Sequence, residues 1–256
     1  MADFAQRRKE QLKSFERLLD IMDELREKCP WDREQTFESI RSNTIEETYE
    51  LADAILQKDM TEIKKELGDL LLHIVFYSKM GSETGSFDIG DVSEAISDKL
   101  IFRHPHVFGT TDVKNSSEVK KNWEEIKMKE GNRTVLGGVP AALPALIKAN
   151  RIQEKARGVG FDWDKRIQVW EKVEEELNEL KAEIEKMDAA KITDEFGDLF
   201  FSLVNAARLY DVDPESALER TNQKFIRRFN YLESQTLRVG RKLKDMTLDE
   251  MNGIWD

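Results

Sequence analysis

The chain has 256 residues, enough for one large domain or two of modest size. Hydrophobic residues make up 39% of it and charged residues 36%, with only 5 Pro and 13 Gly, which favours helices with solvated outer faces over a sheet rich in turns. The formal net charge of -11 argues against a surface that wraps nucleic acid or docks on anionic lipid, because either partner would be repelled. We therefore predict an all-α protein that binds cations, with neither nucleic acid nor a membrane as a partner.

Two features of the sequence bear on the compartment. Cys29 is the single cysteine, so it cannot form an intramolecular disulfide. The first residues, MADFAQRRKEQLKSF, hold no apolar run that would serve as a signal peptide or a membrane span. The expected location is the cytoplasm.

The first predicted helix lies within residues 14–28. Its apolar residues recur at helical spacing, as is typical of a face that packs into a core: Phe15, Leu18, Leu19, Met22 and Leu25. A loop with Trp31 follows. We expect Trp31 here, and Trp163 in the second half of the chain, to anchor their loops in the core, although either could instead stack on a nucleobase.

Two acidic helices come next. The stretch TIEETYELADAI carries Glu46, Glu47 and Glu50, which project from neighbouring parts of one helix side. In KKELGDLLLHIVFYSKM, Glu66 and Asp69 are three apart at the head of an apolar run. If the two helices pack antiparallel, all these acidic groups converge at one level. The expected contact residues are Leu51, Ile55, Leu67, Leu71 and Ile74.

A break in helical periodicity separates the two halves of the chain. Glycines and prolines interrupt the stretch NRTVLGGVPAALPALIKANR. We therefore predict an N-terminal domain at 1–130, a linker at 131–150 and a C-terminal domain at 151–256.

The second half repeats the first. Five acidic residues lie 129 positions after Glu46, Glu47, Glu50, Glu66 and Asp69, namely Glu175, Glu176, Glu179, Glu195 and Asp198. Trp163 matches Trp31, and Lys224 and Arg228 in NQKFIRRF match Lys99 and Arg103 in SDKLIFRH. The chain is therefore a tandem duplication of one helical bundle. Each copy reads as helix, tryptophan loop, two acidic helices and a basic helix.

The acidic residues predict a cation site. Like charges brought together at low dielectric, without a counter-ion, cost several kcal/mol. Ligands that are all oxygen, with no His or Cys, point to Mg²⁺ or Mn²⁺ rather than zinc, and Mg²⁺ commonly holds substrate phosphates. The alternative is a solvated helix face, but such a face has no reason to keep the same gap from Glu50 to Glu66 and from Glu179 to Glu195.

The basic helix of the second copy supplies groups that suit phosphate. Lys224 and Arg228 are four apart and can face one way, with Arg227 beside them. An ammonium and guanidinium forks next to a metal are what a triphosphate chain requires. Taken alone, this stretch could also be a surface face paired with glutamates.

The paired motifs EETYE with ELGD, and EELNE with EFGD, resemble those of the MazG family of nucleoside triphosphate pyrophosphohydrolases, in the all-α NTP pyrophosphatase group. The resemblance covers nearly the whole chain, including HPHVFG and GGVPAALPALIKANRIQEKARGVGFDW. These motifs together are specific to the two-domain form of the family.

The resemblance implies a Mg²⁺-dependent hydrolysis of NTPs and dNTPs to the nucleoside monophosphate and pyrophosphate, serving control of the nucleotide pool, by helical domains that form a homodimer. The implied metal ligands are Glu176, Glu179, Glu195 and Asp198 in the second copy and Glu47, Glu50, Glu66 and Asp69 in the first. The implied triphosphate contacts are Lys191, Lys224, Arg228 and Trp255, to which the basic helix adds Arg227. Glu175 or Glu176 is the candidate base, and Lys224 and Arg228 would offset charge during the reaction.

Several alternatives stay open. We expect the second copy to carry the main activity, because the first has Phe102 where the second has Arg227. The first copy is then a second active site, a regulatory site or a scaffold. A non-catalytic helical adaptor or nucleotide-sensing regulator with a structural metal is the main rival. A di-iron carboxylate bundle ranks lower, because it needs Glu-x-x-His pairs and the second copy has no His.

Overall fold

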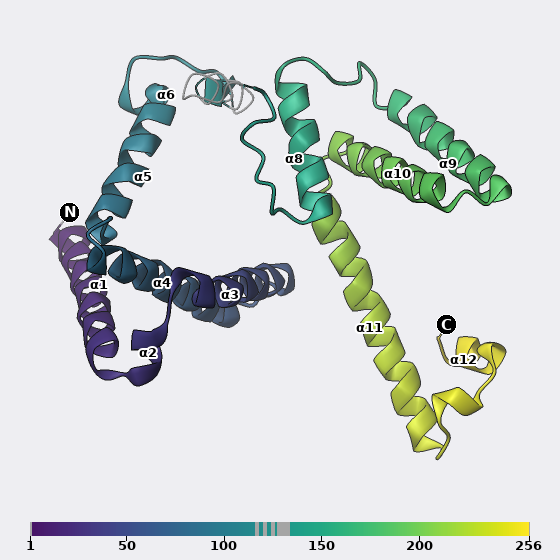
Figure 1. Cartoon of the computed structure of the whole chain (residues 1–256), viewed down its shortest axis with the longest axis horizontal. Coiled ribbons are helices and arrows are strands. Elements are labelled where there is room, and N and C mark those ends of the chain that lie inside the picture. The colour runs from purple at the N-terminus through teal and green to yellow at the C-terminus, as the bar shows by residue number, and fades with distance from the viewer. Residues whose placement is uncertain (1, 116–117, 120–121, 124–125, 127–133, 256) are drawn as a thin grey trace. The chain divides into compact units, whose positions relative to one another are not determined.

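The computed structural model describes residues 2–115, 118–119, 122–123, 126 and 134–255. Within these ranges all regular structure is helical, which confirms the all-α prediction. None of the described helices combines the length and hydrophobicity needed to cross a bilayer. The chain divides into two compact units, Met1–Asp112 and Val113–Asp256, which we describe separately (Figure 1).

The first unit is built on a helical hairpin. Its elements are α1 (Ala2–Lys28), α2 (Pro30–Glu34), α3 (Phe37–Gln57), α4 (Met60–Glu83), α5 (Ile89–Arg103) and α6 (Pro105–Phe108). Helix α4 packs along α3 and also against α1. The core of this unit consists of Met22, Ile40, Val75, Phe76 and Met80. Phe15, Leu18 and Leu19 of α1 pack around it, as the periodicity of the first helix predicts.

The second unit contains the matching hairpin. Its elements are α8 (Ala145–Gly158), α9 (Gln168–Lys186), α10 (Ala189–Leu209), α11 (Pro214–Arg238), the 3₁₀ turn η1 (Leu243–Asp245) and α12 (Leu248–Trp255). Helix α10 packs along α9 and against α8, while α11 extends away from the hairpin with α12 folded against it (Figure 1). Val169, Val173 and Ala206 form the core between α9 and α10.

The predicted domain limits remain a prediction. The units divide between Asp112 and Val113, whereas the sequence places a linker at 131–150. Of that range, 131–133 lies outside the described residues, and α8 begins at Ala145 within it.

The backbone of the two hairpins repeats at the turn. The residues that cap the C-termini of α3 and α9, Lys58 and Met187, are both in the left-handed conformation, with φ of 58° and 59°. The next residue, Asp59 or Asp188, caps the following helix by accepting from its backbone N–H groups. The 129-residue repeat is therefore a repeat of turn geometry as well as of charge.

The predicted contact between the acidic helices is wrong in detail. Ile55, Leu67, Leu71 and Ile74 are 54%, 52%, 38% and 47% exposed. The reason is that α4 is apolar on more than one side. The side with Val75, Phe76 and Met80 enters the core, so the other side faces solvent.

The tryptophans are not core anchors either. Trp31 is 61% exposed and Trp163 is 39% exposed. In the first unit, Pro30 starts the short helix α2. The residue of α2 that is buried is Asp32. Trp31, one residue earlier, faces out.

The turn residues generate a prediction. Left-handed backbone costs a residue with a Cβ atom roughly 1–2 kcal/mol, and glycine adopts it freely. We expect Lys58→Gly and Met187→Gly each to raise the free energy of unfolding by about 1 kcal/mol, measured by urea denaturation. Lys64→Gly, within α4, is the control and should lower it by about 1 kcal/mol. A loss of stability in both turn variants would contradict the assigned geometry.

Candidate functional site

Three carboxylates meet in the first hairpin. Glu47 of α3 and Glu66 and Asp69 of α4 have oxygens that all lie within 4.8 Å of one another, and we call them the N-terminal carboxylate cluster. Glu66 is only 3% exposed. Its Oε1 accepts a hydrogen bond of 2.8 Å from Lys65 Nζ, whereas its buried Oε2 has no hydrogen-bond partner.

The electrostatics of this cluster match its crowding. Burial raises the pKa of Glu47, and the charges of Asp69 and Glu50 add to the rise. The ammonium of Lys65 lowers the pKa of Glu66. Glu50 therefore lies beside the cluster, although it is outside the group of three.

The second hairpin holds a similar group, two of whose three members match the first by the repeat. Glu176 and Glu179 of α9 and Glu195 of α10 also have oxygens within 4.8 Å of one another, and we call them the C-terminal carboxylate cluster. Glu176 is 6% exposed, and its Oε1 lies 2.6 Å from the Nζ of Lys172. Lys172 also reaches Glu175, at 3.1 Å.

Glu195 is the carboxylate of this cluster with the least compensation. Burial raises its pKa most, followed by the charges of Glu179 and Asp198. Its buried Oε2 has no hydrogen-bond partner. Asp198 is thus close to the cluster but outside the group of three.

Both clusters fit a hard divalent cation. Each offers only carboxylate oxygens, and each includes a buried oxygen, on Glu66 or Glu195, that no protein group satisfies. Such oxygens are the ligands of Mg²⁺ and Mn²⁺.

Sequence reasoning missed the lysines at these clusters. Lys172 precedes Glu176 by one helical turn, and Lys65 is adjacent to Glu66. Helical spacing alone could have found Lys172. Comparison of the two copies did not reveal either lysine, because the residues 129 positions away are Asn43 and Asp194 and not lysines.

The predicted triphosphate contacts fall into two places. Arg228 and Trp255 come together, with the guanidinium carbon 5.8 Å from the centre of the indole ring. Lys191 lies in the first turn of α10, near the hairpin turn. Across the described ranges of the chain, Lys224, Arg227 and Arg228 form no ion pair with the C-terminal carboxylate cluster.

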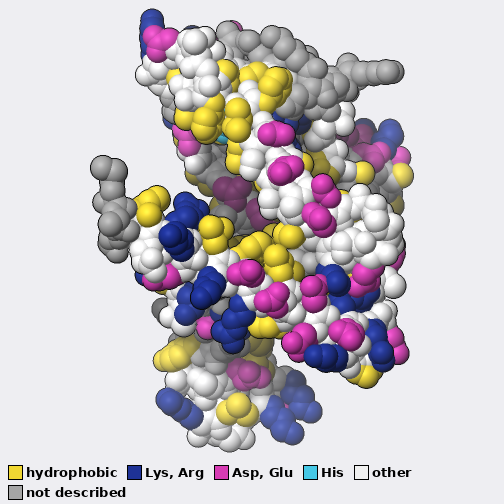
Figure 2. Space-filling model, turned by 90° about the vertical axis from the view of Figure 1, so that its left-hand side faces the viewer, with side chains coloured by type: hydrophobic (Ala, Val, Ile, Leu, Met, Phe, Trp, Pro, Cys, Tyr) yellow, Lys and Arg dark blue, Asp and Glu magenta, His cyan; other side chains and the backbone are white. Residues whose placement is uncertain are grey.

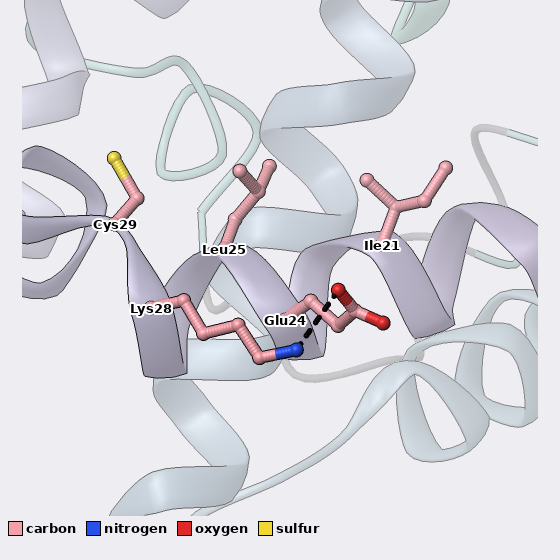
Figure 3. Close-up of a pocket in the computed structure, with 5 residues that line it drawn as sticks. All are labelled: Ile21, Glu24, Leu25, Lys28 and Cys29. Atoms are coloured by element: carbon pink, nitrogen blue, oxygen red, sulfur yellow. Dashed lines mark hydrogen bonds and ion pairs between the residues drawn. The ribbon is translucent and has the colours of Figure 1, made fainter.

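The structure also has a pocket away from the carboxylates. It lies along α1 and is lined by Ile21, Glu24, Leu25, Lys28 and Cys29 (Figure 3). Lys28 donates to Glu24 at 3.1 Å, the contact drawn as a dashed line. None of these residues belongs to either cluster.

A family model matches the two hairpins with the helices that follow them. The MazG nucleotide pyrophosphohydrolase domain matches residues 35–108 and 167–232, more than half of the chain. The chain belongs to the MazG family. Each matched segment contains one carboxylate cluster, and the second also contains the basic part of α11.

Relatives match along almost the full length. The nucleoside triphosphate pyrophosphohydrolase of Escherichia coli K12 is 44% identical over 253 residues, covering 95% of this chain and 96% of that protein. The nucleoside triphosphate pyrophosphohydrolase/pyrophosphatase MazG of Thermotoga maritima is 44% identical over 247 residues, covering 94% of each. The MazG resemblance predicted from the motifs is confirmed.

The raised pKa of Glu195 generates a prediction. A folded state that raises a carboxyl pKa binds that proton more tightly than the unfolded chain does, so the ionised form opposes folding at neutral pH. We expect Glu195→Gln to raise the melting temperature of the metal-free protein by a few degrees at pH 7. The difference should shrink as the pH falls through the raised pKa.

The matched control is Glu185→Gln, which removes the same charge from an exposed position of α9. It should leave the melting temperature unchanged. Added Mn²⁺ should stabilise the wild type and Glu185→Gln but not Glu195→Gln. A lower melting temperature of Glu195→Gln at pH 7 would contradict the prediction, because it would show that the ionised Glu195 side chain stabilises the fold.

Proposed function

We propose that this chain hydrolyses nucleoside triphosphates to the nucleoside monophosphate and pyrophosphate with the help of a divalent cation. The observation that carries the proposal is the C-terminal carboxylate cluster, with buried and unsatisfied oxygen, within a MazG domain match. Full-length relatives named for this reaction support it. Such an enzyme would act on the NTPs and dNTPs of the cytoplasm.

The cation would be Mg²⁺, with Mn²⁺ as a substitute. Glu176, Glu179 and Glu195 would hold it, with Asp198 completing the set. When bound, a divalent cation polarises phosphate oxygens and makes water more acidic. The N-terminal carboxylate cluster, with Glu50 beside it, has the same donor type and would hold a second cation.

The chain's own groups then carry the proton and orient the attack. Glu175 is the better base, because Glu176 belongs to the cluster while Glu175 is exposed next to it. Its carboxylate takes a proton from water as the water oxygen bonds to the α-phosphorus. The bond from that phosphorus to the bridging oxygen breaks, and its electron pair leaves with pyrophosphate.

Cationic side chains offset the charge of the departing pyrophosphate. Lys172 is already beside the cluster, and it can transfer from Glu176 to a phosphate when a cation takes over that carboxylate. Lys191, Lys224, Arg227 and Arg228 supply further positive charge. Trp255, next to Arg228, offers a ring face on which the nucleobase of the substrate can stack.

A homodimer would bring the basic helix to the cluster. The chain leaves many large apolar side chains exposed, and Figure 2 shows such side chains among charged ones on the face in view. On α10, Phe200 is 57% exposed, and on α11 Phe225 and Ile226 are 57% and 54% exposed. Exposed apolar helix faces of this kind mark contact surfaces. The cations of α11, unpaired with their own cluster, would then reach the partner's cluster.

Product analysis tests the reaction. Each NTP and dNTP is incubated with the protein, with and without Mg²⁺, and the products are separated by anion exchange. We expect Mg²⁺-dependent monophosphate and pyrophosphate. Glu179→Gln should lower kcat/KM by roughly a hundredfold or more, since it removes a cation ligand. The matched Glu50→Gln should retain most activity if the C-terminal unit carries the main reaction.

Other products would overturn the proposal in different ways. Diphosphate and phosphate would mean that water attacks another phosphorus. No product from the wild type with any nucleotide would favour a helical adaptor or nucleotide sensor that keeps the metal for structure. Equal losses in both variants would mean that the two units act together.

A heterodimer tests the shared site. Glu179→Gln and Arg228→Ala are carried on differently tagged copies, each inactive as a homodimer, and the mixed dimer is purified on both tags. If carboxylates and cations come from different protomers, one of its two sites is intact and about half of the wild-type activity returns. An inactive mixed dimer, or a monomer in light scattering, would rule out the shared arrangement.

A further inference from the structure

We propose that Glu183 is a positioning residue that holds Lys191 toward the C-terminal carboxylate cluster, so that its ammonium is in place for the triphosphate. The inference rests on the proposed function, because it concerns the same site. Neither the acidic motifs nor the basic helix includes Glu183.

Glu183 occupies an unusual place for a carboxylate. It follows Glu179 by one turn of α9, near the hairpin turn, and its side chain is only 12% exposed. Its Oε1 accepts a hydrogen bond of 2.7 Å from Lys186 Nζ. Its Oε2 is buried, has no hydrogen-bond partner, and lies 4.0 Å from the Nζ of Lys191.

These contacts put Glu183 between the two halves of the site. On one side, its charge is among those that act on Glu195 of the C-terminal carboxylate cluster. On the other side, its Oε2 lies 4.0 Å from the ammonium of Lys191, whose side chain is 61% exposed. A lysine of this exposure, with no attracting group nearby, would sample many rotamers in water. The attraction of Glu183 favours rotamers that keep the Lys191 ammonium next to α9, the helix that carries Glu176 and Glu179.

The duplication argues that the fold itself does not need this carboxylate. The residue 129 positions earlier is Ala54, which is 6% exposed at the same place in the first hairpin. An alanine is therefore sufficient to pack this end of the hairpin. A carboxylate there instead carries a desolvation cost, which function can explain and packing cannot.

The lysines change together with it. The counterparts of Lys186 and Lys191 in the first unit are Gln57 and Glu62. Where the C-terminal site has a carboxylate and two ammonium groups, the N-terminal site has a methyl group, an amide and an acid. A simple helix-stabilising pair between Glu183 and Lys186 would account for one lysine, but not for Lys191 or for the burial.

Steady-state kinetics with matched variants test the proposal. We expect Glu183→Gln to raise KM for the NTP about tenfold with kcat changed less than about threefold. Glu185→Gln, the same substitution at an exposed position of α9, should leave both constants unchanged. Glu183→Ala introduces the residue found at the equivalent position of the first unit, Ala54, and should have the same effect as Glu183→Gln. It replaces the glutamine variant in the test if circular dichroism shows that Glu183→Gln is unstable.

A double-mutant cycle separates positioning from structure. If Glu183 acts through Lys191, then Glu183→Gln combined with Lys191→Met should raise KM no further than Lys191→Met alone. Effects that multiply, or an unchanged KM in Glu183→Gln, would overturn the proposal. The affinity for Mn²⁺ alone, measured by electron paramagnetic resonance, should change less than about threefold. A hundredfold loss would instead make Glu183 a metal ligand.

Failure of the inference and of the proposed function give different results. If the wild-type protein produces no monophosphate, the function is wrong. If the wild type is active and Glu183→Gln has normal KM, only the role of Glu183 is wrong.

Discussion

The structure depends on carboxylates that two packed helices force together. In each hairpin, oxygens from both helices lie within 4.8 Å of one another, and one side chain of each group is nearly excluded from water. Ionised carboxylates at this distance repel strongly at low dielectric. Helices α3 with α4, and α9 with α10, must therefore gain enough from apolar packing and capped turns to hold the charges in place. The lysines at Glu66 and Glu176 relieve part of the repulsion. In the proposed function a bound cation would relieve the remaining repulsion, so the repulsion between the carboxylates would favour cation binding.

Duplication separates what the hairpin requires from what each site adds. The left-handed turn and the aspartate cap occur at equivalent positions in both units, so they belong to the shared design. The buried carboxylate does not, since it is Glu66 of α4 in the first unit and Glu176 of α9 in the second. The lysines do not, since Lys65 and Lys172 stand on different helices and have no counterparts in the other copy. Each unit thus compensates the same repulsion by a separate local solution. A compensating ammonium can come from any nearby position, whereas the proposed metal ligands keep one register in both copies.

The sequence predicted the all-α class and the repeat, because these depend on local periodicity and on a fixed register. It predicted that five acidic residues converge in each hairpin, whereas the structure brings three of them together in each. It did not predict which apolar side of α4 faces the core. Leu67, Leu71 and Ile74 have the same spacing as buried residues, and only three-dimensional packing distinguishes the two sides. It also missed Glu183, because a single glutamate in a chain with 51 acidic residues carries no signal until its burial is known. The tryptophans were misjudged for a related reason, since aromatic character does not specify burial.

The exposed apolar sides and the isolated cations have one explanation in common. A monomer exposes Phe200, Phe225 and Ile226 to water, which forgoes the stabilisation that burial of these side chains would give and favours association. Within the part of the chain that the structure describes, Lys224, Arg227 and Arg228 also form no ion pair with the C-terminal carboxylate cluster. In the proposed homodimer, association through these surfaces would bury the apolar side chains and would bring cations of one protomer to the carboxylates of the other. In the proposed homodimer this arrangement would have a further consequence. The cations of α11 would leave the C-terminal carboxylate cluster of their own protomer unneutralised, and that cluster would keep its proposed affinity for a metal until the partner is present.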